Sequence, residues 1–342
     1  MTDYSDISKL DKKELTEIIS HTGDDAALYA LADKVRRTHY GNKVYIRGLI
    51  EVSSYCKNNC LYCGIRASNA NAQRYRLGKD DVLSCCKEGY MLGFRTFVLQ
   101  GGEDALFTDE FVCDVVSAIK NLYPDCAVTL SLGERSYQSY KAMHDAGADR
   151  YLLRHETANP KLYSMLHPDD LSFERRKECL YNLKNIGYQV GAGFMVGAPY
   201  QTYKDLACDL LFLKELKPHM VGIGPFIPHH DTIFSEFCSG TVTLTLLMIA
   251  LTRLMIPDAM IPATTALNSL DLKGHEHGLE HGANVIMPNL SPFEKRADYS
   301  LYDNKISTGT ESAEGISQII QSLISIGYES ELSRGDHCSI IN

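Results

Sequence analysis

Short apolar runs alternate with longer amphipathic segments along most of the 342-residue chain. The amphipathic segments repeat their apolar residues with a helical period, and several of them end at Gly or Pro, which are helix stop signals. Near-continuous apolar runs between helices are typical of parallel strands that helices cover on the outside. The runs span residues 44–53, 95–100, 127–133, 150–156, 189–197, 220–227, 259–266 and 283–290. The chain is therefore predicted to be an α/β protein with the fold of a (β/α)8 TIM-type barrel.

A doubly wound open sheet is the rival fold for such a pattern. No G-x-G-x-x-G follows the first run, however, and polar residues gather after the carboxyl ends of the runs. In a barrel those ends share one mouth. We expect a helical N-terminal extension over residues 1–43, one barrel over residues 44–327 and a short C-terminal tail over residues 328–342. The pattern leaves open whether the barrel closes fully.

Two helices are expected before the barrel, at residues 12–20 and 24–39. Asp24 or Asp25 is a suitable N-cap for the second helix, and Gly41 stands just past its end.

Composition narrows the classes of partner. Lys and Arg number 34 against 43 Asp and Glu, which gives a formal charge of -9 and argues against a nucleic-acid partner. The N-terminus lacks the apolar core of a signal peptide, and no run of apolar residues is long enough to span a membrane. The odd number of cysteines, eleven, suits a reducing compartment, where they remain thiols or metal ligands. The sequence thus predicts a cytoplasmic protein without a membrane partner.

Cys56, Cys60 and Cys63 follow the first predicted strand in the stretch CKNNCLYC. This places them in a loop at the barrel mouth, where the active sites of this architecture lie. A structural zinc usually takes four protein ligands, whereas a [4Fe-4S] cube on three cysteines leaves one iron open to a small chelating molecule. A zinc loop with a distant fourth ligand and a chance cluster are the alternatives. Spacing and position favour one [4Fe-4S] cluster on these cysteines.

The motif C-x3-C-x-Φ-C, with Tyr62 as its aromatic residue Φ, resembles the signature of the radical S-adenosylmethionine (SAM) superfamily. The resemblance implies that the amine and carboxylate of SAM chelate the open iron. It also implies that an electron from the cluster cleaves SAM to methionine and a 5'-deoxyadenosyl radical. Tyr62 would then pack near the adenine.

Candidate SAM ligands follow the next strands. The second predicted strand ends in LQGGED, where Glu103 can accept a hydrogen bond from an ammonium group. In the radical SAM family a Gly-Gly-Glu motif binds the SAM amine, and Gly101, Gly102 and Glu103 match that motif. The fourth ends in RHETANP, where both oxygens of Glu156 can bind a ribose diol. A structural ion pair between Glu156 and Arg154 is the alternative.

Two further segments complete the predicted SAM site. The helix in SFERRKECL offers Arg175 and Arg176, of which we favour Arg176 for the SAM carboxylate. Met195, in the glycine-rich GAGFMVG, is expected to cover the adenine, with ordinary core packing as its alternative.

Four more segments, YLLRHETANP, MVGIGPFIPH, IPATTA and GANVIMPN, resemble the [FeFe]-hydrogenase maturases of the HydE type. The similarity extends from about residue 30 to about residue 306. It implies a role in assembly of the di-iron subcluster of the hydrogenase H-cluster, through radical chemistry on a small cysteine-bound iron carbonyl cyanide complex. A partner maturase would make that complex, and an electron donor would be needed.

One feature departs from part of this family, in which a second cluster binds three cysteines near the C-terminus. Here KISTGTESAEG contains Ser307 and no cysteine, and Cys338 is the sole cysteine after Cys238. The sequence therefore predicts a single cluster.

A substrate pocket is expected opposite SAM in the barrel. Arg154 ends the fourth predicted strand, and Thr264 and Thr265 end the seventh, so that a guanidinium and two hydroxyls form an anion receptor. Met287 and Tyr302 would complete its wall, and we expect Arg154 and Tyr302 to be the catalytic residues. Capping of the next helix is the alternative for the two threonines, and core packing is the alternative for Met287.

Other functions share these motifs. Methylornithine synthase and a biotin-synthase-like sulfur-inserting enzyme are enzyme alternatives within the superfamily, and a non-catalytic iron-sulfur carrier or scaffold is the alternative from another class. The histidines of HEHGLEHG and of FIPHHDT match no metal motif and are expected to lie in a solvated helix and a loop.

Overall fold

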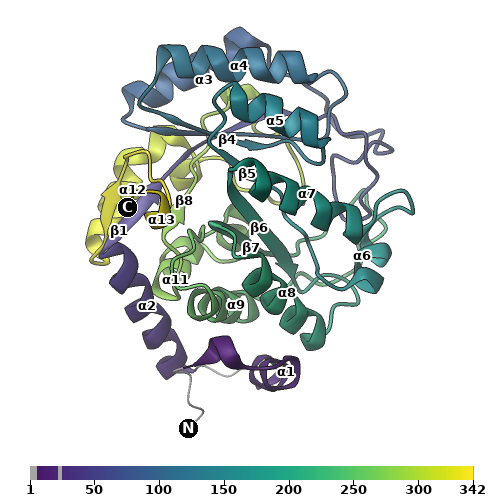
Figure 1. The fold of residues 1–342 in the computed structure, drawn as a ribbon, viewed down its shortest axis with the longest axis vertical. Helices are drawn as coiled ribbons and strands as arrows, with labels where there is room; N and C mark the ends of the chain where they lie inside the picture. The colour runs from purple at the N-terminus through teal and green to yellow at the C-terminus, as the bar shows by residue number, and fades with distance from the viewer. Residues whose placement is uncertain (1–5, 22–24, 342) are drawn as a thin grey trace.

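The main sheet of the barrel contains six parallel strands in chain order. The computed structural model describes residues 6–21 and 25–341. The strands are β2 (Gly48–Ser53), β3 (Thr96–Gly101), β4 (Ala127–Ser131), β5 (Arg150–Leu152), β6 (Gln189–Val196) and β7 (Met220–Pro225). They follow the first six predicted runs, and Figure 1 shows the helices arranged around their outside.

Single bridges close the rest of the ring. Residues 259–266 do not form the regular strand that the sequence predicts, but bridge β7 at Met260 and β8 (Val285–Ile286) at Pro262. Proline has no amide N–H, so a regular ladder does not continue through Pro262. Asn289, just after β8, bridges β2 on the other side. The sheet thus returns to its first strand, and the predicted (β/α)8 barrel is confirmed with two shortened positions.

The first predicted run divides at Arg47. Its first half, β1 (Lys43–Ile46), pairs with β8 and with β9 (Glu329–Glu331) in a separate three-stranded sheet. The Arg47 side chain is buried and donates to the Gly335 carbonyl and to the sulfur of Met220. The polar residue inside an apolar run therefore marks the point where the chain passes from one sheet to the other.

Helices follow the strands along the chain. They are α3 (Lys79–Met91), α4 (Asp109–Leu122), α5 (Tyr137–Asp145), α6 (Pro160–Leu166), α7 (Phe173–Ile186), α8 (Tyr203–Leu216), α9 (Val242–Met255), α10 (Thr265–Leu270), α11 (Gly274–Glu280) and α12 (Ile316–Ser325). Across the described residues, none of them combines the length and the apolar character needed to cross a bilayer.

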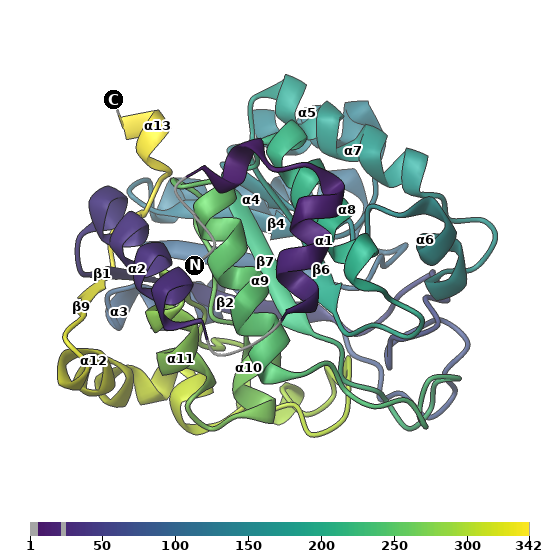
Figure 2. The same cartoon turned by 90° about the horizontal axis from the view of Figure 1, so that it is seen from below.

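Two N-terminal helices explain why α9 is apolar on nearly all sides. α1 (Lys12–Ser20) packs on α8, and α2 (Ala26–Tyr40) packs along α9, as Figure 2 shows. A helix covered on both faces buries its whole circumference. Asp25 caps the start of α2 by accepting the Leu28 N–H, and Gly41 stands just past the end of that helix with a φ of 60°. The other predicted cap, Asp24, lies outside the described residues.

Residues near the C-terminus cover the amino-terminal end of the barrel, opposite to the mouth (Figure 2). Arg150, at the start of β5, is fully buried and donates to Asp336 at 2.7 Å. Gln189, at the start of β6, also donates to Asp336, and Thr96, at the start of β3, donates to the Arg334 carbonyl. These bonds tie three strand starts to one segment.

We predict that Asp336→Ala lowers the free energy of unfolding by roughly 3–5 kcal/mol, because it leaves the buried Arg150 charge without its carboxylate partner. Burial raises the Asp336 pKa, but Arg334 and Arg150 outweigh it and lower the pKa to about 2. The Asp336 pKa is lower in the folded protein than in the unfolded chain, so the ionised carboxylate stabilises the wild-type fold above about pH 4. This stabilisation is lost as the pH falls toward 2. Urea unfolding as a function of pH measures both effects.

The control is Asp145→Ala, which removes an exposed partner of Lys141 and should leave the unfolding midpoint close to that of wild type. Equal unfolding midpoints for wild type and Asp336→Ala would show that the pair does not hold this end of the barrel.

Candidate functional site

A cavity of about 300 Å³ lies at the carboxyl ends of the strands. It gathers side chains and backbone from loops that are far apart in the sequence. The predicted residues that line it are Cys56, Cys60, Tyr62, Cys63, Gly101, Gly102, Glu103, Arg154, Glu156, Arg176, Met195 and Tyr302. The structure therefore brings the cysteine loop and the predicted SAM ligands to one cavity.

The three cysteines provide a donor set that suits an iron-sulfur cluster. All of the chain's eleven cysteines are described, and none forms a disulfide. Burial raises the pKa of Cys60 well above its usual value and that of Cys63 to about 12. A cysteine that binds metal does so as a thiolate, so cluster iron would supply positive charge that offsets the cost of ionising these buried thiols. Three thiols on one wall fit a cluster with one open iron.

Gly102 lets the cysteine loop approach the end of β3. A Cβ atom at this position would lie 2.2 Å from the Tyr55 carbonyl oxygen and 2.8 Å from Cys56 Cβ. No larger residue fits without moving the loop. The sequence predicted that this glycine admits a ligand, and the structure shows that it also admits the loop that carries Cys56.

Tyr62 is held by a histidine that the sequence did not single out. The Tyr62 hydroxyl lies 3.3 Å from His167 Nε2, and the His167 Nδ1 lies 2.9 Å from the Tyr163 carbonyl. Burial lowers the His167 pKa to about 3, so the ring is neutral, donates through Nδ1 and accepts from Tyr62. Tyr62 and Met195 share one apolar cluster. The two predicted adenine contacts thus belong to the same apolar cluster.

Glu103 is fixed from three directions. Its carboxylate accepts the Glu134 backbone N–H at 2.9 Å and pairs with Lys57 at 3.2 Å. Gly133, with a φ of 76°, leaves the room that the side chain fills, because a Cβ there would lie 2.0 Å from Glu103 Cγ. Lys57 and Glu134 were not predicted, since neither stands in a recognisable motif.

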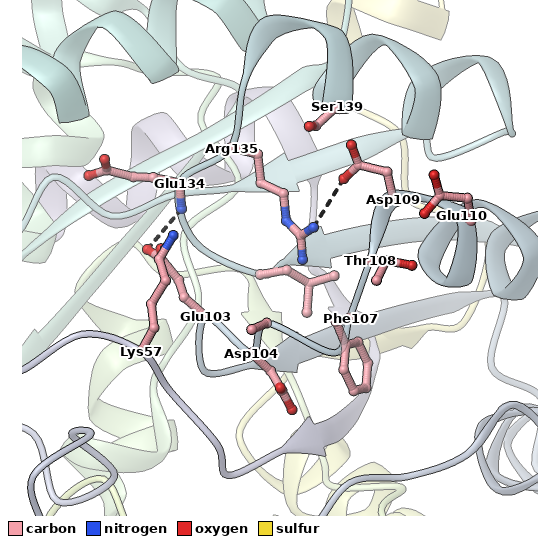
Figure 3. Close-up of a pocket in the computed structure, with 12 residues that line it drawn as sticks. Lys57, Glu103, Asp104, Phe107, Thr108, Asp109, Glu110, Glu134, Arg135 and Ser139 are labelled. Carbon is pink, nitrogen blue, oxygen red and sulfur yellow. Dashed lines mark hydrogen bonds and ion pairs between the residues drawn. The ribbon is translucent and has the colours of Figure 1, made fainter.

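A second cavity, of about 430 Å³, lies on the other side of Glu103 (Figure 3). Two of its carboxylates have partners: Asp109 accepts from Arg135 at 3.1 Å, and Asp104 accepts from Arg76 and Ser53, which lie outside the lining. Glu103 lines both cavities, so its carboxylate stands between the central site and this outer space.

Arg154 and Glu156 lie in the turn after β5, not within the longer strand that the sequence predicts. Glu156 has a φ of 64°, a left-handed conformation that costs on the order of 1–3 kcal/mol for a non-glycine residue. Arg154 Nη2 lies 3.0 Å from Glu156 Oε2, but the geometry is not that of a hydrogen bond, and both atoms lack hydrogen-bond partners among the described residues. Buried polar atoms in this state are ready to bind a ligand.

Helix α8 holds this strained turn. The buried carboxylate of Asp209 accepts the Ala158 N–H and lies 3.4 Å from His155 Nε2. Asp205, one helical turn earlier, accepts from the Asn159 side chain. The two aspartates thus fix the residues that follow Glu156.

Arg176, rather than Arg175, reaches the cavity, because Arg175 pairs with Glu178 on the surface. Arg176 donates through Nε to Glu134 and through Nη1 to the Arg154 carbonyl. Burial alone would lower the Arg176 pKa, but Tyr163 and Glu134 outweigh it and hold the pKa above its usual value. Its Nη2 nitrogen makes neither of these bonds and remains available for a ligand.

The residues of the predicted substrate pocket do not all lie in the cavity. Tyr302 lines the cavity with Arg154, and burial raises the Tyr302 pKa, so the phenol keeps its proton. Thr264 caps α10 by accepting the Leu267 N–H, and Thr265 donates to Glu311 at 2.6 Å. Met287 packs with a separate apolar cluster that contains Met220 and Met260. These three residues lie outside the cavity lining; Thr264 makes the capping contact of the alternative interpretation, whereas the Thr265 hydroxyl is bonded to Glu311 instead.

Comparisons with known proteins agree with this geometry. The model of the Radical SAM superfamily matches residues 50–213, from β2 to α8. The "[FeFe] hydrogenase maturase subunit HydE" of Thermotoga maritima is 48% identical over 313 residues, which cover 90% of this chain and 89% of that protein. The 3-methylornithine synthase of Methanosarcina acetivorans is 30% identical over 88% of this chain and 84% of its own length.

The fold has a solved counterpart in the crystal structure of methylornithine synthase (PylB). It superposes with a TM-score of 0.83 and 25% identity over 96% of this chain and 97% of that one. Both predicted resemblances are confirmed: the chain belongs to the radical SAM superfamily, whose enzymes use a [4Fe-4S] cluster and SAM, and within it to the HydE group of [FeFe] hydrogenase maturases.

Proposed function

We propose that this enzyme cleaves SAM reductively and uses the 5'-deoxyadenosyl radical in assembly of the di-iron subcluster of the [FeFe]-hydrogenase H-cluster. Its substrate would be a small cysteine-bound iron carbonyl cyanide complex supplied by another maturation protein. The observation that carries the proposal is the meeting of three cluster-type cysteines and the predicted SAM ligands in one cavity of a chain that is 48% identical to HydE. When bound, the cluster supplies the electron that breaks a carbon–sulfur bond of SAM.

Three side chains would bind SAM. Glu103 would accept from the SAM ammonium in place of Lys57, whose side chain is 60% exposed and free to move away. Glu156 would accept from the ribose hydroxyls, and its Oε2 atom, which is buried without a hydrogen-bond partner in the described part of the chain, supports this role. Arg176 would bind the carboxylate with the one nitrogen that it does not use for Glu134 and Arg154.

Arg154 and Tyr302 would act on the substrate side. Two guanidinium nitrogens of Arg154 are buried without a hydrogen-bond partner among the described residues, although Nη2 lies in ion-pair distance of Glu156, and this suits an anionic carboxylate or a cyanide. Tyr302 stays protonated and can donate to the same group. Thr264, Thr265 and Met287 would support this pocket indirectly, through α10 and the apolar cluster.

A second enzyme function is favoured by one observation, the fold similarity to methylornithine synthase. The lower identity to that enzyme, 30% against 48% for HydE, places it second. We further propose that the enzyme is cytoplasmic, since none of its eleven cysteines forms a disulfide. An electron donor would reduce its cluster.

Glu156→Gln is predicted to weaken SAM binding about ten- to a hundredfold, which corresponds to roughly 1.5–3 kcal/mol for one charge-assisted contact. The amide keeps the size of the side chain, so that the strained turn and the cluster content should not change. Equilibrium binding of SAM to anaerobically reconstituted protein measures the effect. Glu178→Gln, which alters an exposed carboxylate, is the control, and a wild-type SAM affinity in Glu156→Gln would remove the assignment.

Arg154→Met and Tyr302→Phe are predicted to keep the cluster and SAM cleavage but to abolish hydrogenase maturation. The test is hydrogenase activity in a deletion strain of the host that is complemented with each variant. Thr265→Val should instead lower the free energy of unfolding by roughly 1–3 kcal/mol, because it leaves the buried Glu311 with one donor fewer. Wild-type maturation by both Arg154→Met and Tyr302→Phe would contradict the proposed pocket.

A further inference from the structure

Residues 299–305, the cover segment, lie over part of the central cavity. The segment stands between β8 and α12 and contains neither helix nor strand. Tyr299, Leu301 and Tyr302 line the cavity from this segment. Backbone without a regular hydrogen-bond pattern does not hold its shape by itself, so the position of these side chains depends on contacts with the barrel.

Two backbone contacts attach the cover segment to loops at the mouth. The Gly64 N–H, in the cysteine loop, donates to the Leu301 carbonyl at 2.9 Å. The Asp303 N–H donates to the Pro228 carbonyl at 3.1 Å. A Cβ atom at Gly64 would lie 2.3 Å from the Ser300 carbonyl oxygen. The cover segment therefore lies directly against the loop that carries the cluster cysteines.

A third contact attaches the cover segment to a strand and is ionic. Lys305 Nζ donates to Glu51 Oε1, on β2, at 2.5 Å. The side chains of Lys305 and Glu51 are only 11% and 1% exposed. The other oxygen of Glu51 accepts from the Asn289 side chain at 2.8 Å, so the carboxylate has a fixed orientation. Lysine is seldom buried to this extent unless it is paired.

The same ammonium joins the two ends of the cover segment. Lys305 Nζ also donates to the Tyr299 carbonyl at 3.1 Å. Tyr302 lies midway between these ends, so it belongs to a stretch whose ends are tied to each other and to β2. A buried ion pair often adds less stability than apolar residues of similar size, but both partners are satisfied in only one arrangement. The pair is therefore better suited to fixing this segment in place than to stabilising the fold.

We propose that Lys305 is a positioning residue, which through Glu51 holds Tyr302 at the substrate side of the cavity. This inference rests on the proposed function, in which Tyr302 acts on the substrate while other residues bind SAM. The cysteine loop keeps its own hydrogen bond to the end of β3, from the Lys57 N–H to the Glu103 carbonyl at 2.9 Å. Loss of the Lys305 ion pair should therefore disturb the substrate side and leave the cluster and SAM cleavage in place.

The first test compares Lys305→Met with Lys295→Met in full-length protein that has been reconstituted anaerobically. Lys295 stands in the same connection between β8 and α12, and its ammonium lies 6.0 Å from the centre of the Tyr75 ring, without an ion pair to any described residue. Hydrogen–deuterium exchange across residues 299–305 should be at least about tenfold faster in Lys305→Met than in wild type, and unchanged in Lys295→Met. Wild-type exchange in Lys305→Met would overturn the proposal, whatever the enzyme acts on.

Activity separates positioning from stability. Lys305→Met should keep the cluster content and the kcat and KM of SAM cleavage, but should lower hydrogenase maturation in a complemented deletion strain at least about tenfold. The double variant Glu51→Gln/Lys305→Met leaves no unpaired buried charge, so it should recover the wild-type melting temperature but not maturation. It also replaces the single variant in every assay if the latter does not fold.

Recovery of maturation by the double variant would show that the ion pair acts through stability alone and would overturn the proposal, as would wild-type maturation by folded Lys305→Met. Failure of the wild-type gene to complement the deletion strain would instead contradict the proposed function. The exchange measurement would still test the hold of Lys305 on the cover segment.

Discussion

The contact between the cysteine loop and the end of β3 is the constraint on which the site depends. Gly102 N–H donates to the Ser53 carbonyl at 3.1 Å, and Lys57 N–H donates to the Glu103 carbonyl at 2.9 Å. These bonds continue the pairing of β2 and β3 beyond the ends of both strands. Because Gly102 has no side chain, Cys56 can lie directly against this backbone. A cluster on the loop is thereby placed beside Glu103, which is the first of the proposed SAM ligands.

From Glu103 the remaining groups hold one another in sequence around the mouth. Glu103 accepts the Glu134 N–H, the Glu134 carboxylate accepts from Arg176, and Arg176 donates to the Arg154 carbonyl. The loops after β3, β4 and β5 and the helix α7 are thus joined by hydrogen bonds that are largely shielded from water, where such bonds are strong. Asp209, on helix α8, fixes the strained turn at Glu156 by accepting the Ala158 N–H. A ligand would therefore meet charges whose positions are set before it binds, which reduces the cost of binding.

Much of this arrangement follows from local sequence. Apolar runs predict the strands β2 to β7, and the rule that parallel strands present their carboxyl ends at one mouth predicts that Cys56, Glu103, Glu156 and Arg176 meet. The run at residues 259–266 misled the prediction because Pro262 interrupts the hydrogen-bond ladder, a local signal that could have been given more weight.

The parts that sequence reasoning missed depend on partners that are distant along the chain. Thr265 is 46 residues from Glu311, and Tyr62 is 105 residues from His167, so no spacing pattern connects them. The left-handed conformation of Glu156 is equally hidden, since glutamate rarely adopts it without support from the surrounding structure. Asp205 and Asp209 show the helical spacing of an exposed face, yet both are buried against the turn that they hold.

The most direct test of the central claim is the yield of 5'-deoxyadenosine from anaerobically reconstituted protein that is supplied with SAM and a strong one-electron reductant. Iron and sulfide are measured on the same samples. The account predicts about four irons per chain and formation of 5'-deoxyadenosine together with methionine in the wild type. It predicts that Cys60→Ala loses both the cluster and the product, while Cys238→Ala, which alters an exposed thiol, keeps both. Full iron content in Cys60→Ala, or an intact wild-type cluster that releases no 5'-deoxyadenosine, would contradict it.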